Sequence, residues 1–262
     1  MGVLNTTPDS FSDGGRYLDP DAAVAHAVAL RTAGADIIDV GGESTRPGAE
    51  RVAPEVERER VLPVIEALAA AGVVVSIDTM NAATAAAGVA AGARIVNDVS
   101  GGLADPDMFA AVAASDADIV IGHWRGHSAD MYAAARYVDL VAEVVSELQE
   151  RVGAAAASGI APSRVVLDPG VGFGKRGDQN WAVLRDLDRI VGLGKRVLVG
   201  TSRKGFLRDA LGDEPDLHRR DAATAVTSVL AADAGAWGVR VHEVAATRDA
   251  LAVRRLWREG GT

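Results

Sequence analysis

Eight short apolar segments recur along the chain, and almost every one ends in, or runs directly into, a polar or charged residue. They cover residues 1–5, 36–41, 73–78, 94–98, 118–122, 164–168, 196–200 and 237–241. Most are continuously apolar and rich in Val and Ile, a pattern typical of strands that are buried on both faces of a parallel sheet. The sequence therefore predicts eight parallel strands.

The stretches between these segments predict helices. They cover residues 20–34, 54–71, 81–91, 105–115, 137–158, 179–188, 220–234 and 244–258. Such an alternation indicates either a (β/α)₈ barrel or a doubly wound sheet. A Rossmann-type sheet would need G-x-G-x-x-G after its first strand, and the first strand here runs into NTTPDSFSDGG instead. We therefore expect an α/β fold of the TIM-barrel type, in which functional groups lie at the carboxyl ends of the strands.

The 262 residues fit one barrel, and no composition break or linker divides them. We therefore expect a single domain over residues 1–262. Two long polar stretches, residues 6–19 and 43–53, follow the first and second predicted strands. Because they would lie on the functional face, we expect them to be mobile loops that take part in function.

Composition excludes several classes of protein. The chain has no cysteine, which rules out disulfides, thiolate metal sites and thiol catalysis. Its net charge of −9 disfavours nucleic acid and anionic membranes as partners. It contains neither a signal peptide nor an apolar run near the ~18 residues of a membrane span. We expect a cytoplasmic protein that binds any anionic ligand through a local cationic cluster.

Three side chains with carboxylate or amide groups end the third, fourth and sixth predicted strands. They are Asp78, Asn97 and Asp168. Such groups suit a flat heterocycle with a guanidine-like edge, because a carboxylate can accept two parallel N–H bonds. Pterin and guanine rings have this edge. A metal site is the alternative, although hard cations usually gather more carboxylates.

The motif DPGVGFGK, residues 168–175, lets the backbone approach a ligand closely because glycine flanks both Val171 and Phe173. It is not a Walker A loop, since Lys175 is followed by Arg176 rather than Ser or Thr. Phe173 is either the apolar wall of an aromatic site or a residue of the core, and the sequence leaves both possibilities open.

A local cationic patch is predicted where the last strands meet the first. TSRKGF, residues 201–206, follows the seventh strand with Ser202 and Lys204, and barrels often bind phosphate in this region. Arg240 and His242 end the eighth strand, which a barrel places beside the first strand and Asn5. These groups could bind a pyrophosphate, with Asn5 as one oxygen ligand to Mg²⁺, which needs few protein ligands.

Seven stretches together resemble the dihydropteroate synthases of the pterin-binding enzyme family. They are MGVLNTTPDSFSDGG, IIDVGGESTRPGA, VSIDTM, IVNDVSGG, LDPGVGFGK, LVGTSRKGFL and GVRVHEV, in this order over residues 1–244. The resemblance implies a transferase of folate biosynthesis, which joins p-aminobenzoate to 6-hydroxymethyl-7,8-dihydropterin pyrophosphate and releases pyrophosphate. It also implies Mg²⁺ as cofactor and a homodimer formed through helices late in the barrel.

The resemblance also assigns residues to three subsites. For the pterin it implies Asp78, Asn97, Asp168, Lys204 and Arg240, with Arg240 stacked on the ring. For the pyrophosphate it implies Asn5, Thr45, Arg240 and His242, with Asn5 toward the metal. For p-aminobenzoate it implies Arg46, Pro47, Phe173 and Lys204, with the helix that follows Lys204. The residues expected to act in catalysis are Asp168, Lys204, Arg240 and His242.

Two positions depart from the pattern of that family: Gly122 stands where a bulky apolar residue is often found over the pterin, and Gly205 where serine is common. We expect the first to loosen the pterin wall. Three other functions remain open: a paralogue that only binds pterins, a corrinoid-linked folate methyltransferase, and a barrel used as a scaffold or regulator. The SRK turn, the long first loop and the full set of polar strand ends disfavour them.

Overall fold

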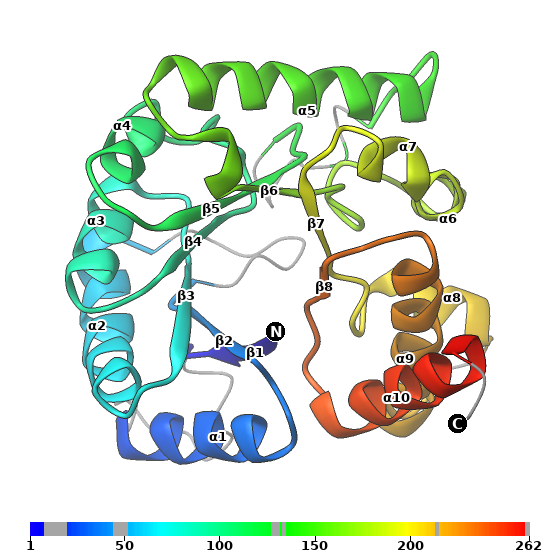
Figure 1. The fold of residues 1–262 in the computed structure, drawn as a ribbon, viewed down its shortest axis with the longest axis horizontal. Helices are drawn as coiled ribbons and strands as arrows, with labels where there is room; N and C mark the ends of the chain where they lie inside the picture. The colour runs from blue at the N-terminus through cyan, green and yellow to red at the C-terminus, as the bar shows by residue number, and fades with distance from the viewer. Residues whose placement is uncertain (8–19, 44–51, 127–131, 133–134, 213–214, 260–262) are drawn as a thin grey trace.

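The computed structural model describes residues 1–7, 20–43, 52–126, 132, 135–212 and 215–259 (Figure 1). The strands are β1 (Gly2–Asn5), β2 (Ile37–Gly41), β3 (Val74–Asp78), β4 (Ile95–Asp98), β5 (Asp118–Gly122), β6 (Val165–Asp168), β7 (Arg196–Val199) and β8 (Gly238–Val239). The helices are α1 (Pro20–Thr32), α2 (Pro54–Ala70), α3 (Ala82–Ala90), α4 (Met108–Ala113), α5 (Leu140–Ala157), the 3₁₀ helix η2 (Pro162–Arg164), α6 (Asp178–Arg185), α7 (Leu187–Val191), α8 (Gly205–Leu211), α9 (Leu217–Asp233) and α10 (Val244–Glu259).

The eight strands are parallel, pair in sequence order from β1 to β8, and curl into a TIM-like barrel surrounded by the helices (Figure 1). The segment that follows β8 returns to β1, because Val241 forms a parallel bridge with Gly2. The Val3 amide donates to the Val241 carbonyl at 2.9 Å, and the Val241 amide donates to the Met1 carbonyl at 3.0 Å. The prediction that the eighth segment lies beside the first is therefore confirmed.

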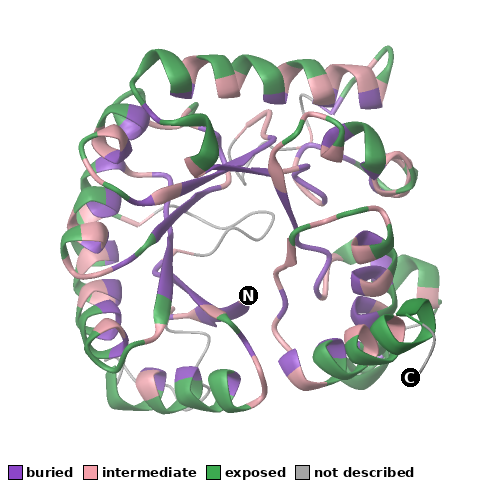
Figure 2. Cartoon of the chain, in the orientation of Figure 1, coloured by how far each residue is buried: buried purple, intermediate pink, exposed green. Residues whose placement is uncertain are grey.

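Alternation along the strands divides the apolar core in two. Ile95, Val120, Val166 and Leu198, one from each of β4 to β7, form a small cluster of their own. Their neighbours along the same strands belong to the large cluster that packs against the helices. Since successive side chains of a strand point to opposite faces, the small cluster fills the barrel interior. Figure 2 shows buried strands inside and exposed residues on the outer faces of the helices.

The predicted strands agree with the structure to within about two residues, but several helices needed correction. The helix expected over 179–188 is two helices, α6 and α7, which meet at Asp186. The helix expected from residue 105 begins at Met108, because the Asp105 carboxylate accepts the amides of Ala82 and Asp107 and forms a turn. The helix expected from residue 137 begins at Leu140, where the Asp139 side chain caps it.

Most of the two long loops, residues 8–19 and 44–51, lies outside the described residues, so their mobility stays a prediction. Within the part of the chain that is described, no helix has the length and apolar character needed to cross a membrane.

Candidate active site

Arg240 joins the middle of β2 to the carboxyl end of β3. Its Nε donates to Asp39 Oδ2 at 2.6 Å, and one terminal nitrogen donates to Asp78 Oδ2, also at 2.6 Å. Asp39 is fully buried and the Arg240 side chain is 19% exposed. The guanidinium therefore lies between two carboxylates that strands far from it in sequence bring to the same end of the barrel.

Asn97, at the end of β4, completes this cluster. Its Nδ2 donates to the same oxygen, Asp39 Oδ2, at 3.0 Å. Within the described residues the other oxygen, Asp39 Oδ1, is buried and has no hydrogen-bond partner. Because a buried carboxylate oxygen without a donor is costly, this atom marks a place where a ligand N–H or a water would be stabilised.

Asp39 is the site residue that the sequence analysis missed. Its position relative to the other site residues depends on the strand register. Asp39 pairs with Ser76, which lies two residues before the end of β3. A signal was present, since Asp39 is the single charged residue within the apolar run IIDV. A charge in a strand buried on both faces needs a partner, and that requirement alone points to a polar site.

Asp168, at the end of β6, faces two lysines. Its Oδ1 accepts the Gly170 amide at 2.7 Å. Burial raises the pKa of Asp168, while the nearby Lys204 ammonium counteracts that shift. Burial lowers the pKa of Lys204 to about 8, although the Asp168 carboxylate favours its charge. Both residues are partly exposed, and each charge favours the charged form of the other.

The loop that follows β6 brings Phe173 to Lys204. The Lys204 Nζ lies 4.7 Å from the centre of the Phe173 ring and donates to the Val171 carbonyl. Phe173 is partly exposed and belongs to neither apolar cluster. Of the two interpretations left open by the sequence, this placement favours the wall of a ligand site over core packing.

His242 and Arg240 have different partners, although they are two residues apart. His242 Nδ1 lies 2.9 Å from Ser202 Oγ, which also accepts the His242 amide at 3.1 Å. This pair links the end of the barrel to the turn after β7. The same turn places Arg203 at φ 59°, and Arg203 makes two hydrogen bonds with Asp221 at 2.8 and 2.9 Å.

Asn5 lies at the end of β1, paired in register with Gly41. Among the described residues no group of three or more His, Asp or Glu side chains could hold a metal ion. A magnesium ion at Asn5 would therefore take most of its ligands from a substrate and from water, as this ion commonly does. Thr45, Arg46 and Pro47 lie outside the described residues.

Gly122 does not leave the opening expected from its missing side chain. A Cβ atom there would lie 2.4 Å from the Val99 carbonyl oxygen and 2.7 Å from Val99 Cα. The backbone after β4 therefore fills the direction that a side chain would take. The expected loosening of the wall has no support at this position.

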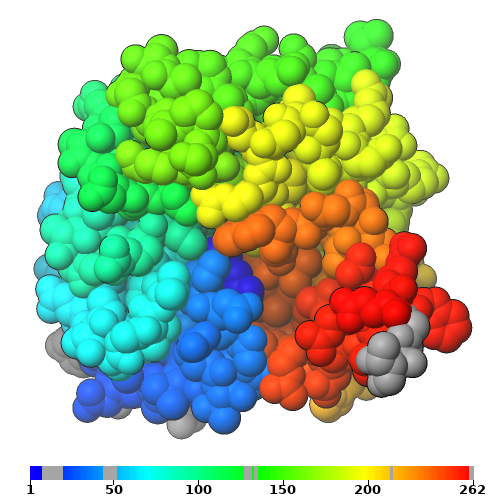
Figure 3. Space-filling model, in the orientation of Figure 1, coloured from blue at the N-terminus to red at the C-terminus, as the bar shows by residue number. Residues whose placement is uncertain are grey.

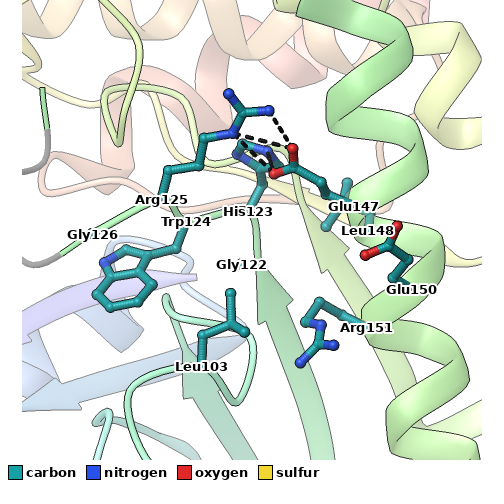
Figure 4. A pocket seen from close by; sticks show the side chains of 10 residues that line it. All are labelled: Leu103, Gly122, His123, Trp124, Arg125, Gly126, Glu147, Leu148, Glu150 and Arg151. Carbon is teal, nitrogen blue, oxygen red and sulfur yellow. Dashed lines mark hydrogen bonds and ion pairs between the residues drawn. The ribbon is translucent and has the colours of Figure 1, made fainter. Parts of the chain in front are cut away.

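A cavity of about 690 Å³ lies beside the end of β5, between the turn after β4 and helix α5 (Figure 4). Trp124 and Leu103 line one side of it, and Glu150 and Arg151 line the other. None of the clustered groups around Arg240 and Asp168 lines this cavity. We therefore place the chemistry at the charged cluster, where buried ionisable groups with shifted pKa values converge.

Comparisons with known proteins identify the family of the chain. Residues 1–242 match the family model described as "Pterin binding enzyme". A dihydropteroate synthase from Mycobacterium leprae is 53% identical over the whole chain and 94% of its own length. The structure of the Xanthomonas albilineans dihydropteroate synthase with 4-aminobenzoic acid has a TM-score of 0.91 at 44% identity, covering 98% of this chain and 92% of that one. Its complex with 7,8-dihydropteroate has a TM-score of 0.88 at 41% identity, with the same coverage.

Proposed function

The chain belongs to the pterin-binding enzyme family, and we propose that it is a dihydropteroate synthase. It condenses 6-hydroxymethyl-7,8-dihydropterin pyrophosphate with p-aminobenzoate to give 7,8-dihydropteroate and pyrophosphate. The single observation that carries the proposal is the convergence of Asp39, Asp78, Asn97 and Arg240, next to the pair of Asp168 and Lys204.

The cluster suits the pterin ring. Its guanidine-like edge presents parallel N–H donors, which Asp168 or Asp78 can accept as a carboxylate, while Asn97 offers both a donor and an acceptor. One oxygen of Asp78 is already bonded to Arg240. Arg240 therefore moves or shares that carboxylate when the pterin binds, and its planar guanidinium can then stack on the ring.

The reaction breaks the bond between the pterin methylene carbon and a pyrophosphate oxygen, and forms a bond from that carbon to the amine nitrogen. The amine loses one proton. Arg240 and His242 neutralise the charge that develops on the leaving pyrophosphate, which lowers the barrier. Asp168 stabilises positive charge that the dihydropterin shares with its methylene carbon. A neutral aryl amine is already nucleophilic, so no strong general base is required.

Mg²⁺ is proposed as the cofactor, with Asn5 as a protein ligand beside His242 and Arg240. When bound, the ion supplies further charge neutralisation for the pyrophosphate. Asn5 is partly exposed at the end of β1, and its amide oxygen fits an ion that the substrate itself largely holds.

The p-aminobenzoate site is proposed at Phe173 and Lys204, with Arg46 and Pro47 from the second loop and Thr45 toward the pyrophosphate. Phe173 provides an aromatic face, and Lys204 provides a charge near the carboxylate. We further propose that the two long loops close over the site and exclude water, which would otherwise capture the activated pterin. A cytoplasmic location stays a prediction from the sequence.

The direct test is to incubate the protein with the dihydropterin pyrophosphate, Mg²⁺ and p-aminobenzoate and to detect dihydropteroate by mass spectrometry. A synthase forms the product in many turnovers, and Asp168→Ala forms none. Pterin binding without product would instead support the binding-only paralogue. Methyl transfer from a methylated folate to a corrinoid, without dihydropteroate formation, would support the methyltransferase.

We also propose that two copies of the chain associate through α9 and α10, which lie together at one side of the barrel (Figure 3). Among the described residues, seven of the twelve large hydrophobic residues that are exposed fall on or between these helices: Leu217, Val226, Leu230, Trp237, Val253, Leu256 and Trp257. An apolar surface of this kind favours a self-complementary contact with a second copy.

Sedimentation velocity tests the dimer. Trp257 is 86% exposed, so Trp257→Glu places a charge in the proposed contact without disturbing the core. We expect this variant to sediment as a monomer at concentrations where the wild type is a dimer. Val28→Glu, on the exposed face of α1, is the matched control and should remain dimeric; equal behaviour of the two variants would contradict the proposed face.

A further inference from the structure

Lys175 is buried beneath the loop that carries Asp168 and Phe173. It is among the largest fully buried side chains of the protein, with 1% exposure. Its Nζ lies 2.8 Å from His123 Nδ1 and donates to the carbonyls of Gly170 at 3.0 Å and Phe173 at 3.1 Å. An ammonium group has three N–H donors, and each of the three finds an acceptor here.

The protonation of the neighbours follows from this geometry. Because the ammonium has no acceptor, His123 Nδ1 must accept, so the imidazole proton lies on Nε2. The Nε2–H then donates to Oε2 of Glu147, a residue of α5, at 2.9 Å. Arg125 also donates to this carboxylate (Figure 4). Burial, together with the Lys175 charge, lowers the pKa of His123 to about 4, in agreement with a neutral ring.

The loop above Lys175 has little freedom to move. At Gly170 the φ angle is +65°, and a Cβ atom would lie 2.0 Å from the His123 carbonyl oxygen. The Gly172 amide donates to Asn180 Oδ1 at 2.7 Å, and Lys204 donates to the Val171 carbonyl. The carbonyls of residues 170, 171 and 173 are thus all bonded to lysine ammonium groups.

Position 175 holds a lysine in a chain that otherwise uses arginine for most of its positive charges. The chain has 27 basic residues, of which only three are lysine: Lys175, Lys195 and Lys204. Two of these three hold the loop after β6. A compact ammonium can direct three bonds from one atom inside a tight turn, which the planar guanidinium of arginine cannot do.

We propose that Lys175 is a positioning residue of the synthase, which sets Asp168 and Phe173 in their working geometry and is itself oriented by His123 and Glu147. This inference rests on the proposed function. Lys175 acts from behind the loop and touches no substrate. One buried side chain would thereby hold both Asp168, the carboxylate proposed for the pterin, and Phe173, the proposed wall of the p-aminobenzoate site.

Charges from several elements surround the ammonium group. Asp168 and Glu147 favour its charge, while Lys204 and Arg125 oppose it. Burial is the largest influence and lowers the pKa of Lys175 to about 7. A neutral amine has two N–H donors for its three acceptors, so loss of the proton would leave one of the three contacts unmade.

Lys175→Met tests the proposal, because it keeps the length of the side chain and removes all three bonds. We expect the KM for p-aminobenzoate and the pterin Kd each to rise at least about tenfold. We expect kcat/KM to fall by about 100-fold, the loss that a displacement of about 1 Å can cause. The affinity for inorganic pyrophosphate, whose proposed residues Asn5 and His242 lie at the end of β1 and after β8, should stay within about twofold.

Lys195→Met is the matched control, since Lys195 lies in the turn before β7 and away from the cluster. It should leave all three affinities and kcat unchanged. Unchanged constants in Lys175→Met, or equal losses for pyrophosphate and the other two ligands, would overturn the positioning role. Equal losses would mean general damage to the barrel.

If Lys175→Met does not fold, Glu147→Gln tests the positioning role instead. The Glu147 side chain is 34% exposed, and glutamine has nearly the same shape, so this variant should fold. We expect its KM for p-aminobenzoate to rise several-fold with pyrophosphate affinity unchanged; an unchanged KM would overturn the proposal. Wild-type protein that forms no dihydropteroate would overturn the proposed function and this inference with it. An active wild type with an unaffected variant would overturn this inference alone.

Discussion

Replacing Asp39 by alanine should damage both the stability of the barrel and the binding of the pterin. One oxygen of this fully buried carboxylate accepts from Arg240 Nε at 2.6 Å and from Asn97 Nδ2 at 3.0 Å. Alanine removes the acceptor and leaves both donors in place. Arg240 keeps only Asp78 as a charged partner, and Asn97 loses the bond that orients its amide.

The magnitude follows from these two bonds. A hydrogen bond to a charged group contributes about 1.5–3 kcal/mol, and removing one partner of a buried ion pair costs about 3–5 kcal/mol. We therefore expect Asp39→Ala to lower the free energy of unfolding by about 4 kcal/mol. Asp39→Asn keeps an oxygen for both donors but places an amide where Oδ1 already lacks a partner, so its cost should be nearer 1–2 kcal/mol.

Chemical denaturation of the two variants and the wild type measures the free energies, and calorimetry measures the pterin Kd. The affinity for pterin should fall at least about tenfold in Asp39→Ala, because two of its proposed binding groups lose their orientation. Leu4→Ala, a fully buried apolar change on β1, is a control for loss of stability alone. If both Asp39 variants lost less than about 1 kcal/mol and bound pterin normally, the central cluster would be wrongly described.

Three further predictions concern the same end of the barrel. Asp168→Ala should abolish pterin binding in calorimetry, and near-normal affinity would refute the assignment of that carboxylate. Because burial lowers the pKa of Lys204 from 10.5 to about 8, the folded state holds fewer protons than the unfolded state between these values. The contribution of Lys204 to stability should therefore rise with pH over this window while kcat/KM falls, and in pH profiles Lys204→Met should lack that alkaline fall. Asp221→Asn should weaken the two bonds that hold Arg203 at its positive φ, with a loss of about 1–3 kcal/mol in thermal unfolding and a higher KM for p-aminobenzoate.

The barrel was predictable because its strands are short, apolar and separated by amphipathic stretches, and because the polar residues stand at one end of each. Asp78, Asn97 and Arg240 were found in this way, and the structure joins them through Asp39. Side-chain partners were harder to predict. Arg240 lies 201 residues from Asp39 and 162 residues from Asp78 in the sequence. Its bonds to these carboxylates form only because the curled sheet brings its last strand close to β2 and β3.

Lys175 shows the other limit of the sequence. A basic residue after a glycine-rich loop looks like a ligand-binding group, yet this one points beneath the loop and is nearly inaccessible. It contacts His123, which follows β5, and His123 in turn contacts Glu147 on α5. No periodicity in the sequence announces such a contact, because it joins three separate elements.

Pyrophosphate release is the measurement that tests the central claim most directly. The protein is supplied with the dihydropterin pyrophosphate, Mg²⁺ and p-aminobenzoate together, and then with each of the three left out. The account predicts release only when all three are present, with one dihydropteroate formed for each pyrophosphate. Release that does not depend on p-aminobenzoate, or no release from a protein that binds the pterin, would contradict it.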